Sequence, residues 1–283
     1  MTIGIAAHFD KGLVLCSDTK LVNPSGLTSS RSKQSVSAFA TKQMFISAYA
    51  GDDAEAAEAL CREIVSAAGD VEHPHEFDRA VKKTMSQWWR AYGQVKPPEL
   101  EFLIAHVSVK DGYSQILKCS PPGTINRPTG AVAIGCGAEI VGHYPGLLWP
   151  RPSSPVRYHP LKTVLLRLAY LMKLAKERDG QFVGGRTDVA VISEVGSFTF
   201  IDRDEMEKAE KFAASADKLL EKIAAQILSA DADDGDDLAD ADKLAKEHAD
   251  LMIRRKDVSF SHLDLLEKSV WRRARTKKLT PQT

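Results

Sequence analysis

Residues 2–18 read TIGIAAHFDKGLVLCSD and carry the strongest structural signal in the chain. Two apolar runs flank Asp10-Lys11-Gly12, and an aspartate close to a glycine between such runs is typical of a β-hairpin turn. Asp18 ends the second run. Thr2 follows the initiator methionine, which is usually removed before a small residue. Thr2 would then carry a hydroxyl and a free α-amine, and this amine, with a pKa of about 7.7–8, can accept the hydroxyl proton near neutral pH.

Three later segments add glycines and aspartates in a definite order. Residues 47–56 read SAYAGDDAEA, which predicts a strand that meets a helix at Ala50-Gly51. Residues 133–138 read AIGCGA, and Asp179 precedes the pair Gly184-Gly185 by five positions. Each segment alone is a weak motif, but their order along the chain is informative.

Together with Thr2, Gly12 and Asp18, these segments make the chain resemble the proteasome β-type N-terminal nucleophile hydrolases, over roughly residues 2–205. The three residues fall at the family's relative spacing for nucleophile, hairpin glycine and site aspartate. The resemblance implies that the Thr2 hydroxyl attacks a carbonyl while the Thr2 amine acts as the base. It also implies that the N–H of Gly51 stabilises the oxyanion. No metal and no organic cofactor are implied.

The family's lysine has no direct counterpart here. It stands on the strand before the Ala-Gly junction, and a gapless count back from Gly51 reaches Ser37 instead. Lys33 is the nearest basic residue on that stretch, and it is our candidate for the cation that pairs with the aspartate if the following loop is longer than usual. Lys20 and Arg31 are the alternatives.

Two further site candidates depart from the family pattern. Cys136 replaces the serine of the family's Gly-Ser-Gly segment, and Asp179 lies one residue further from its glycine pair. Both are candidates for secondary site residues. In addition, a shift of one residue would align Thr2 with a later, non-nucleophilic threonine of the family, at the cost of an inserted residue before Gly12.

These features predict a threonine-type hydrolase that acts on peptide or amide bonds. One alternative is a catalytically inactive structural or binding subunit of the same fold. Another is an amide ligase or amidase, because an acyl-enzyme at a threonine can pass its acyl group to an amine as well as to water. The resemblance implies a homo-oligomer with a peptide or protein substrate; the sequence names no unfoldase or adaptor.

Composition and cysteine spacing indicate which partners and which cellular compartment to expect. The formal net charge of the 283 residues is zero, so the chain has no general attraction to nucleic acid or to an anionic membrane. No apolar run approaches the ~20 residues of a membrane span, and the first residues do not fit a secretory signal peptide. The four cysteines show no C-x-x-C spacing, which favours buried thiols in a reducing compartment. We expect a cytoplasmic protein without a nucleic-acid or membrane partner.

The periodicity of apolar residues predicts an α+β domain with an appended helical region. Strands are expected at Ile3–Phe9, Leu13–Ser17, Val36–Phe39, Met44–Ala50, Leu100–Val109, Tyr113–Cys119, Ala131–Ile134, Val189–Ser193 and Ser197–Ile201. Helices are expected at 52–67, 76–92, 161–178 and 202–227. Hairpins dominate, so the sheets should be mainly antiparallel with helices in outer layers. The resemblance implies a four-layer α/β/β/α sandwich over residues 1–205. Further helix patterns at 238–253 and 261–277 make the tail longer than the family needs, and they predict a helical C-terminal extension over 206–283.

Overall fold

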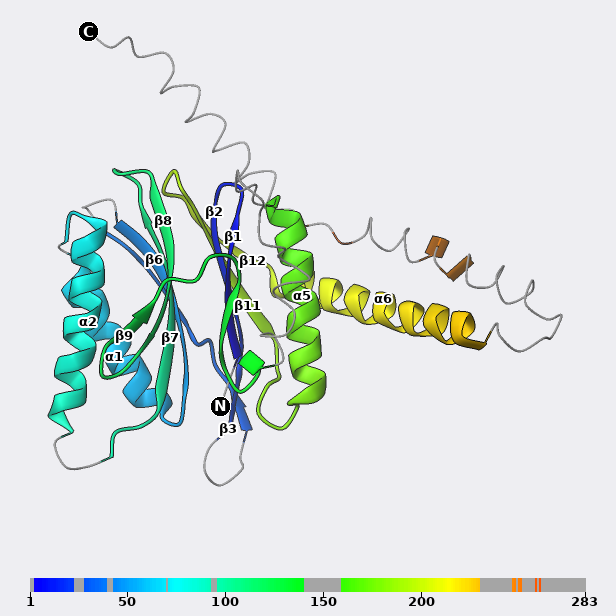
Figure 1. The fold of residues 1–283 in the computed structure, drawn as a ribbon, viewed down its shortest axis with the longest axis horizontal. Coiled ribbons are helices and arrows are strands. Elements are labelled where there is room, and N and C mark those ends of the chain that lie inside the picture. Colours follow the sequence, from blue (N-terminus) through cyan, green and yellow to red (C-terminus); the bar gives the residue numbers. More distant parts are fainter. Residues whose placement is uncertain are drawn as a thin grey trace, which may run out of the picture.

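The structure is a computed structural model. It describes residues 3–22, 28–39, 43–69, 71–92, 96–139 and 159–229, together with residues 246, 247, 249, 250, 258 and 260. Thr2 and most of the expected extension after residue 229 lie outside this description. Within the described residues, two five-stranded antiparallel sheets lie face to face, and each carries two long helices on its outer face (Figure 1).

The first sheet has the order β10-β1-β2-β11-β12 and is covered by α5 and α6. Its strands are β1 (Ile3–Phe9), β2 (Gly12–Asp18), β10 (Val132–Gly135), β11 (Thr187–Ser193) and β12 (Phe198–Ile201). Its helices are α5 (Leu161–Arg178) and α6 (Arg203–Ser229).

The second sheet has the order β5-β6-β7-β8-β9 and is covered by α1 and α2. Its strands are β5 (Gln34–Ala38), β6 (Gln43–Gly51), β7 (Leu100–Ser108), β8 (Tyr113–Ser120) and β9 (Thr124–Asn126). Its helices are α1 (Ala54–Ala68) and α2 (Pro74–Ala91). A small hairpin of β3 (Lys20–Val22) and β4 (Thr28–Ser30) continues from the end of β2.

The layers follow from the alternation of side chains along each strand. In β2, Val14 and Cys16 pack under α5 and α6, whereas Leu13 and Leu15 face the other sheet. Because both faces of each sheet are covered, β1 and β2 are buried along their whole length. The four-layer α/β/β/α sandwich expected from the sequence is therefore confirmed.

Gly12 shows why the first hairpin requires a glycine. It begins β2 at φ +158°, directly beside β11, and a Cβ atom at this position would lie 2.1 Å from the backbone oxygen of Ile192. A side chain here would push the two strands apart. The hairpin glycine is thus fixed by the close approach of β2 and β11.

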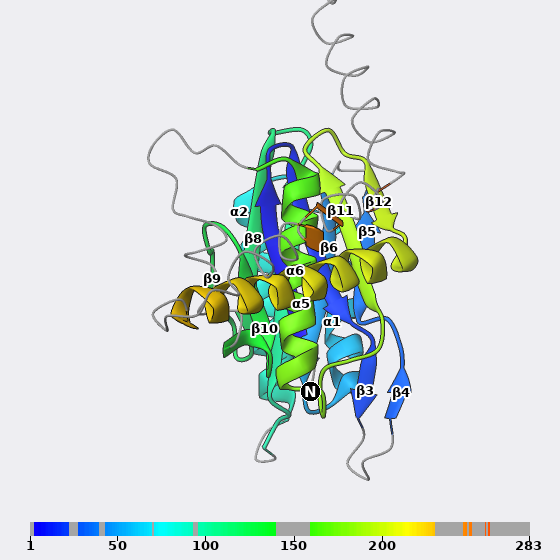
Figure 2. The same cartoon turned by 90° about the vertical axis from the view of Figure 1, so that its right-hand side faces the viewer.

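Helix α6 belongs to the core at its beginning and leaves it further on. Met206 and Ala209 are fully buried in the same cluster as β1 and α5, so the expected boundary at 205/206 falls inside this helix. Figures 1 and 2 show α6 crossing α5 and then extending beyond the sandwich. Leu220, in the extending part, is 64% exposed. In the described part of the chain, none of the helices is long and apolar enough to cross a membrane.

Candidate active site

Asp18, the last residue of β2, is fully buried and collects donors from three distant parts of the chain. Its Oδ1 accepts hydrogen bonds from Lys33 Nζ at 2.8 Å and from the backbone N–H of Ile3 at 3.0 Å. Its Oδ2 accepts from the N–H of Gly184 at 3.2 Å. A buried carboxylate needs such partners, because an unpaired one would be strongly disfavoured.

Lys33 is the cation at this carboxylate. Both side chains of the pair have no exposed surface, and Lys33 Nζ also donates to the backbone oxygen of Lys20 at 2.5 Å. Burial lowers the pKa of Lys33, and the neighbouring Asp18 partly opposes this effect. The ammonium therefore releases its proton more readily than an exposed lysine does.

The two alternative cations are engaged elsewhere. Lys20 Nζ donates to the backbone oxygen of Gly180 at 2.7 Å, and Arg31 forms an ion pair with Glu58 at 2.7 Å. Lys33 directly precedes β5, and the long β5–β6 hairpin accommodates the extra residues between it and Gly51. The gapless count reaches Ser37, four residues after the lysine that pairs with Asp18.

The beginning of β1 lies between two other parts of the site. Ile3 pairs with Gly135 at the end of β10, and Gly4 pairs with Ser17 of β2, next to Asp18. The N–H of Ile3 is itself bonded to Asp18. The residue that follows Thr2 is thus held directly between the carboxylate and the glycine-rich segment after β10.

Gly51 ends β6 at the wall of a cleft with a volume of about 500 Å³. Cys136 and Trp89 line the same cleft. Gly51 has φ +154°, and a Cβ atom there would lie 2.3 Å from the backbone oxygen of Glu99. Asp53 accepts hydrogen bonds from the first turn of α1, which starts the helix right after this bend. The Ala-Gly junction of the sequence is therefore a tight strand-to-helix turn that opens onto a cleft.

Cys136 follows β10, and the charge of Asp179, at the C-terminal end of α5, acts on it. Cys136 is half-buried, and its pKa is raised by burial and, to a smaller extent, by the charge of Asp179. The backbone oxygen of Asp179 accepts hydrogen bonds from the N–H groups of Phe182 and Val183, both at 2.8 Å. This turn places the N–H of Gly184 within hydrogen-bond distance of the Asp18 carboxylate.

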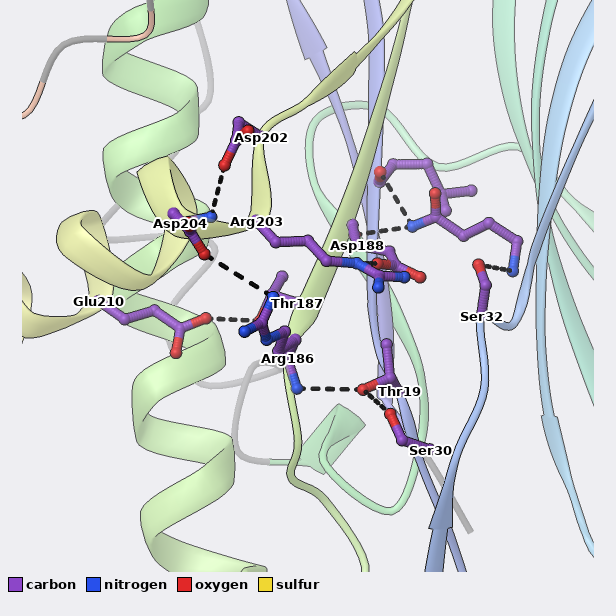
Figure 3. Close-up of polar contacts among 12 residues, drawn as sticks. Thr19, Ser30, Ser32, Arg186, Thr187, Asp188, Asp202, Arg203, Asp204 and Glu210 are labelled. Atoms are coloured by element: carbon purple, nitrogen blue, oxygen red, sulfur yellow. Dashed lines mark hydrogen bonds and ion pairs between the residues drawn. The ribbon is translucent and has the colours of Figure 1, made fainter.

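Thr19 is a structural residue of the site that the sequence analysis did not find. It is buried, and its hydroxyl oxygen accepts hydrogen bonds from the Ser30 hydroxyl and from the N–H of Arg186, both at 3.0 Å (Figure 3). Thr19 thus joins the β3–β4 hairpin to the segment before β11. A single polar residue between Asp18 and Lys20 gives no sequence signal for such a contact.

The arrangement can support attack by a nucleophile placed just before Ile3. A buried carboxylate–ammonium pair binds the N–H of Ile3, and Cys136, which follows the strand that pairs with Ile3, lines the cleft bordered by Gly51. Residues 2–144 match the family model described as "Proteasome subunit". The chain belongs to this family.

Solved structures similar to this proteasome-family chain include Anbu proteins, and they support the fold. They include Anbu, described as an ancestral β-subunit, from Yersinia bercovieri: 16% identity, TM-score 0.60, covering 79% of this chain and 97% of that one. A Gly-1 mutant of Anbu from Hyphomicrobium sp. strain MC1 has 14% identity and a TM-score of 0.62, with the same coverage.

A third similar structure, described as the helical assembly of the Anbu complex, comes from Pseudomonas aeruginosa. It has 14% identity and a TM-score of 0.56, and the match covers 78% of this chain and 96% of that one. No curated protein matches the sequence significantly. At these identities the likeness to solved structures concerns the fold alone.

Proposed function

We propose that this protein is a proteasome-like threonine hydrolase that cleaves peptide bonds, with Thr2 as nucleophile after removal of Met1. The observation that carries the proposal is the buried Lys33–Asp18 pair, whose carboxylate binds the N–H of Ile3, the residue that follows Thr2. Family membership supports it as well.

In the proposed reaction, the hydroxyl oxygen of Thr2 attacks the substrate carbonyl carbon and its proton passes to the Thr2 amine. The N–H of Gly51 donates to the oxyanion. Collapse of the tetrahedral intermediate leaves an ester on Thr2, and the departing amine takes the proton. Water then hydrolyses the ester. The charge of Lys33, held by Asp18, lowers the proton affinity of the Thr2 amine so that the amine is free to act as the base.

The test combines the mass of the intact protein with covalent labelling. We expect the purified protein to lack Met1 and to form one adduct with a peptide vinyl sulfone, mapped to Thr2. Thr2→Ala, which still permits removal of Met1, should form no adduct, and Thr2→Ser should keep some labelling. Retention of Met1 together with no adduct would contradict the proposal and favour an inactive structural subunit. Transfer of an acyl group to added amines, in place of hydrolysis, would indicate a ligase.

We also propose that the protein forms a homo-oligomer and takes peptide segments as substrates. One structure with the same fold is described as a helical assembly of the Anbu complex. Enclosure of the site in an assembly would restrict it to unfolded segments or peptides.

A further inference from the structure

A second ion pair lies beside the candidate site and links it to α6. Lys176 of α5 donates to both carboxylate oxygens of Glu210 on α6, at 3.0 and 2.8 Å. The two side chains are only 19% and 14% exposed. Screening by solvent is therefore weaker than for a surface pair, and the balance of the two charges matters to their neighbours.

Thr187 connects this pair to Asp18. Thr187 is the first residue of β11 and the direct cross-strand partner of Asp18. Its hydroxyl donates to Glu210 Oε1 at 2.5 Å and accepts from Lys176 Nζ at 2.9 Å. Figure 3 shows Glu210 reaching from α6 to Thr187 at the beginning of β11. The carboxylate of α6 thus fixes the residue that faces Asp18 across the sheet.

Charged groups from both ion pairs affect the pKa of one buried residue, Cys16. The pKa of Cys16, on the same face of β2 as Asp18, is raised chiefly by burial and then by Glu210, whereas Lys176 lowers it and Asp18 raises it. Among the described residues, Lys33 and Cys136 are further titratable groups that interact electrostatically with Asp18. Glu210 is therefore the carboxylate that balances the half-buried ammonium of Lys176.

We propose that Glu210 is a positioning residue of the active site: it holds Thr187 opposite Asp18 and neutralises Lys176, so that Lys33 alone sets the positive charge at the nucleophile. This inference rests on the proposed function. It assigns to α6, at the start of the region beyond residue 205, a role in the site itself.

Glu210→Gln removes the negative charge of the side chain and nearly preserves its size and shape. Glutamine can still accept from Thr187, but it leaves the charge of Lys176 without its counter-ion. At an effective dielectric constant of about 20, a positive charge about 10 Å away lowers the pKa of an ammonium by about one unit. The amine of Thr2 must be neutral to act as the base, so the variant should become reactive at lower pH.

Asp217→Asn is the matched control. Asp217 lies about two turns further along α6 and pairs with Lys173 of α5 at 2.6 Å. Lys173 also pairs with Glu177, so its charge stays partly balanced in the control. The two variants thus lose one carboxylate charge from the same helix pair, at different distances from Asp18.

The rate of Thr2 labelling by a peptide vinyl sulfone is measured against pH for the native protein and both variants. We expect the rising limb of the profile to move down by about one pH unit in Glu210→Gln and to stay in place in Asp217→Asn. A common profile for all three proteins would overturn the inference, because a purely structural role of Glu210 would change the rate and leave the pH dependence unmoved.

A second measurement is independent of the reaction. Asp18→Asn is combined with Glu210→Gln and, separately, with Asp217→Asn, and the urea midpoints of all variants are compared. We expect the first double variant to lose more than the sum of its single changes, because Asp18 then no longer compensates Lys176, and the second pair to be additive. Additivity in both cycles would overturn the inference. Absence of labelling in the native protein would instead count against the proposed function, while the cycles would still decide the role of Glu210.

Discussion

Asp18 and Lys33 depend on each other because both are buried without any exposed surface. We predict that Lys33→Met abolishes labelling of Thr2 and lowers the free energy of unfolding by about 3–5 kcal/mol, since it leaves a buried carboxylate without its counter-ion. Urea unfolding and labelling measure the two effects. The control is Arg31→Met, which breaks an ion pair whose arginine is 57% exposed and should cost less than about 1 kcal/mol. Equal losses in the two variants would contradict the prediction.

Gly51 provides a second test at the level of one residue. In Gly51→Ala the new Cβ would lie 2.3 Å from the oxygen of Glu99, so we predict loss of labelling and a clear loss of stability. Gly130→Ala is the matched control, because Gly130 also has a positive φ, +104°, but no atom lies within 4 Å of its Cβ position. It should cost only the backbone strain, about 1–2 kcal/mol. The prediction fails if Gly51→Ala is labelled at Thr2 to the same extent as Gly130→Ala and has the same free energy of unfolding.

The sequence could indicate candidate residues of the site but not their contacts. Thr2, Asp18 and Gly51 follow from motif spacing, and Lys33 emerges as the nearest basic residue. Side-chain burial and the choice among the three cations depend on the β5–β6 hairpin, whose length no local pattern reveals. The backbone donors to Asp18 from Ile3 and Gly184 depend on sheet register and on the turn after α5. Thr2 itself lies outside the described residues, and its role remains our proposal.

At the scale of the elements, His106 of β7 is buried against Phe77 of α2, and its hydrogen bonds define its protonation state. His106 stacks on Phe77 at 3.8 Å; its Nε2 donates to the carbonyl of Gln43, and its Nδ1 accepts from the amide of Gln115. Both ring nitrogens are satisfied by the neutral form only. Burial lowers the pKa of His106 from 6.5 to about 3, an effect that Asp111 partly opposes.

This depressed pKa predicts a loss of stability in mild acid. The contribution is fully present above pH 6.5 and decreases as the pH falls from 6.5 toward about 3, because only the unfolded chain gains the proton there. Between pH 6.5 and 4.5 we expect His106 to account for about 2 kcal/mol of lost stability. Urea unfolding at several pH values checks this in the native protein and in His106→Leu, which should lose this part of the pH dependence. An unchanged slope in the variant would refute it.

Element prediction succeeded where burial is two-sided or amphipathic and failed where it is not. Strands β1, β2, β6 and β7 are mostly apolar and are buried over nearly their whole length, and they were predicted close to their observed limits. Strand β4 is fully exposed and three residues long, so it has no apolar pattern to detect. The same holds for β9, which carries a single apolar residue, Ile125.

For the whole molecule, the exposed aromatic residues of β12 suggest where subunits meet. Phe198 and Phe200 are 47% and 53% exposed, their ring centroids are 6.2 Å apart, and β12 ends the order of the first sheet. Aromatic side chains are enriched in protein interfaces. We predict that the native protein elutes well above its monomer mass of 31.0 kDa and that Phe198→Ser with Phe200→Ser lowers the mass.

Light scattering at micromolar concentration measures these masses. Leu220→Ser, which changes a 64% exposed residue of α6, is the control and should leave the mass unchanged. A monomeric native protein would contradict the prediction of a homo-oligomer. A large assembly that is insensitive to both phenylalanines would place the contact on another surface.

The sequence positions of the three donors to Asp18 determine when the site can form during synthesis of the chain. They come from residues 3, 33 and 184, so the carboxylate is fully partnered only after the ribosome has produced residue 184 and the segments have joined. An unfinished chain carries its threonine from the beginning of synthesis, yet it lacks the environment that would make that threonine reactive. If the proposed function holds, a nascent chain that has not yet reached residue 184 is harmless to its neighbours, because synthesis of that segment is itself an activating step.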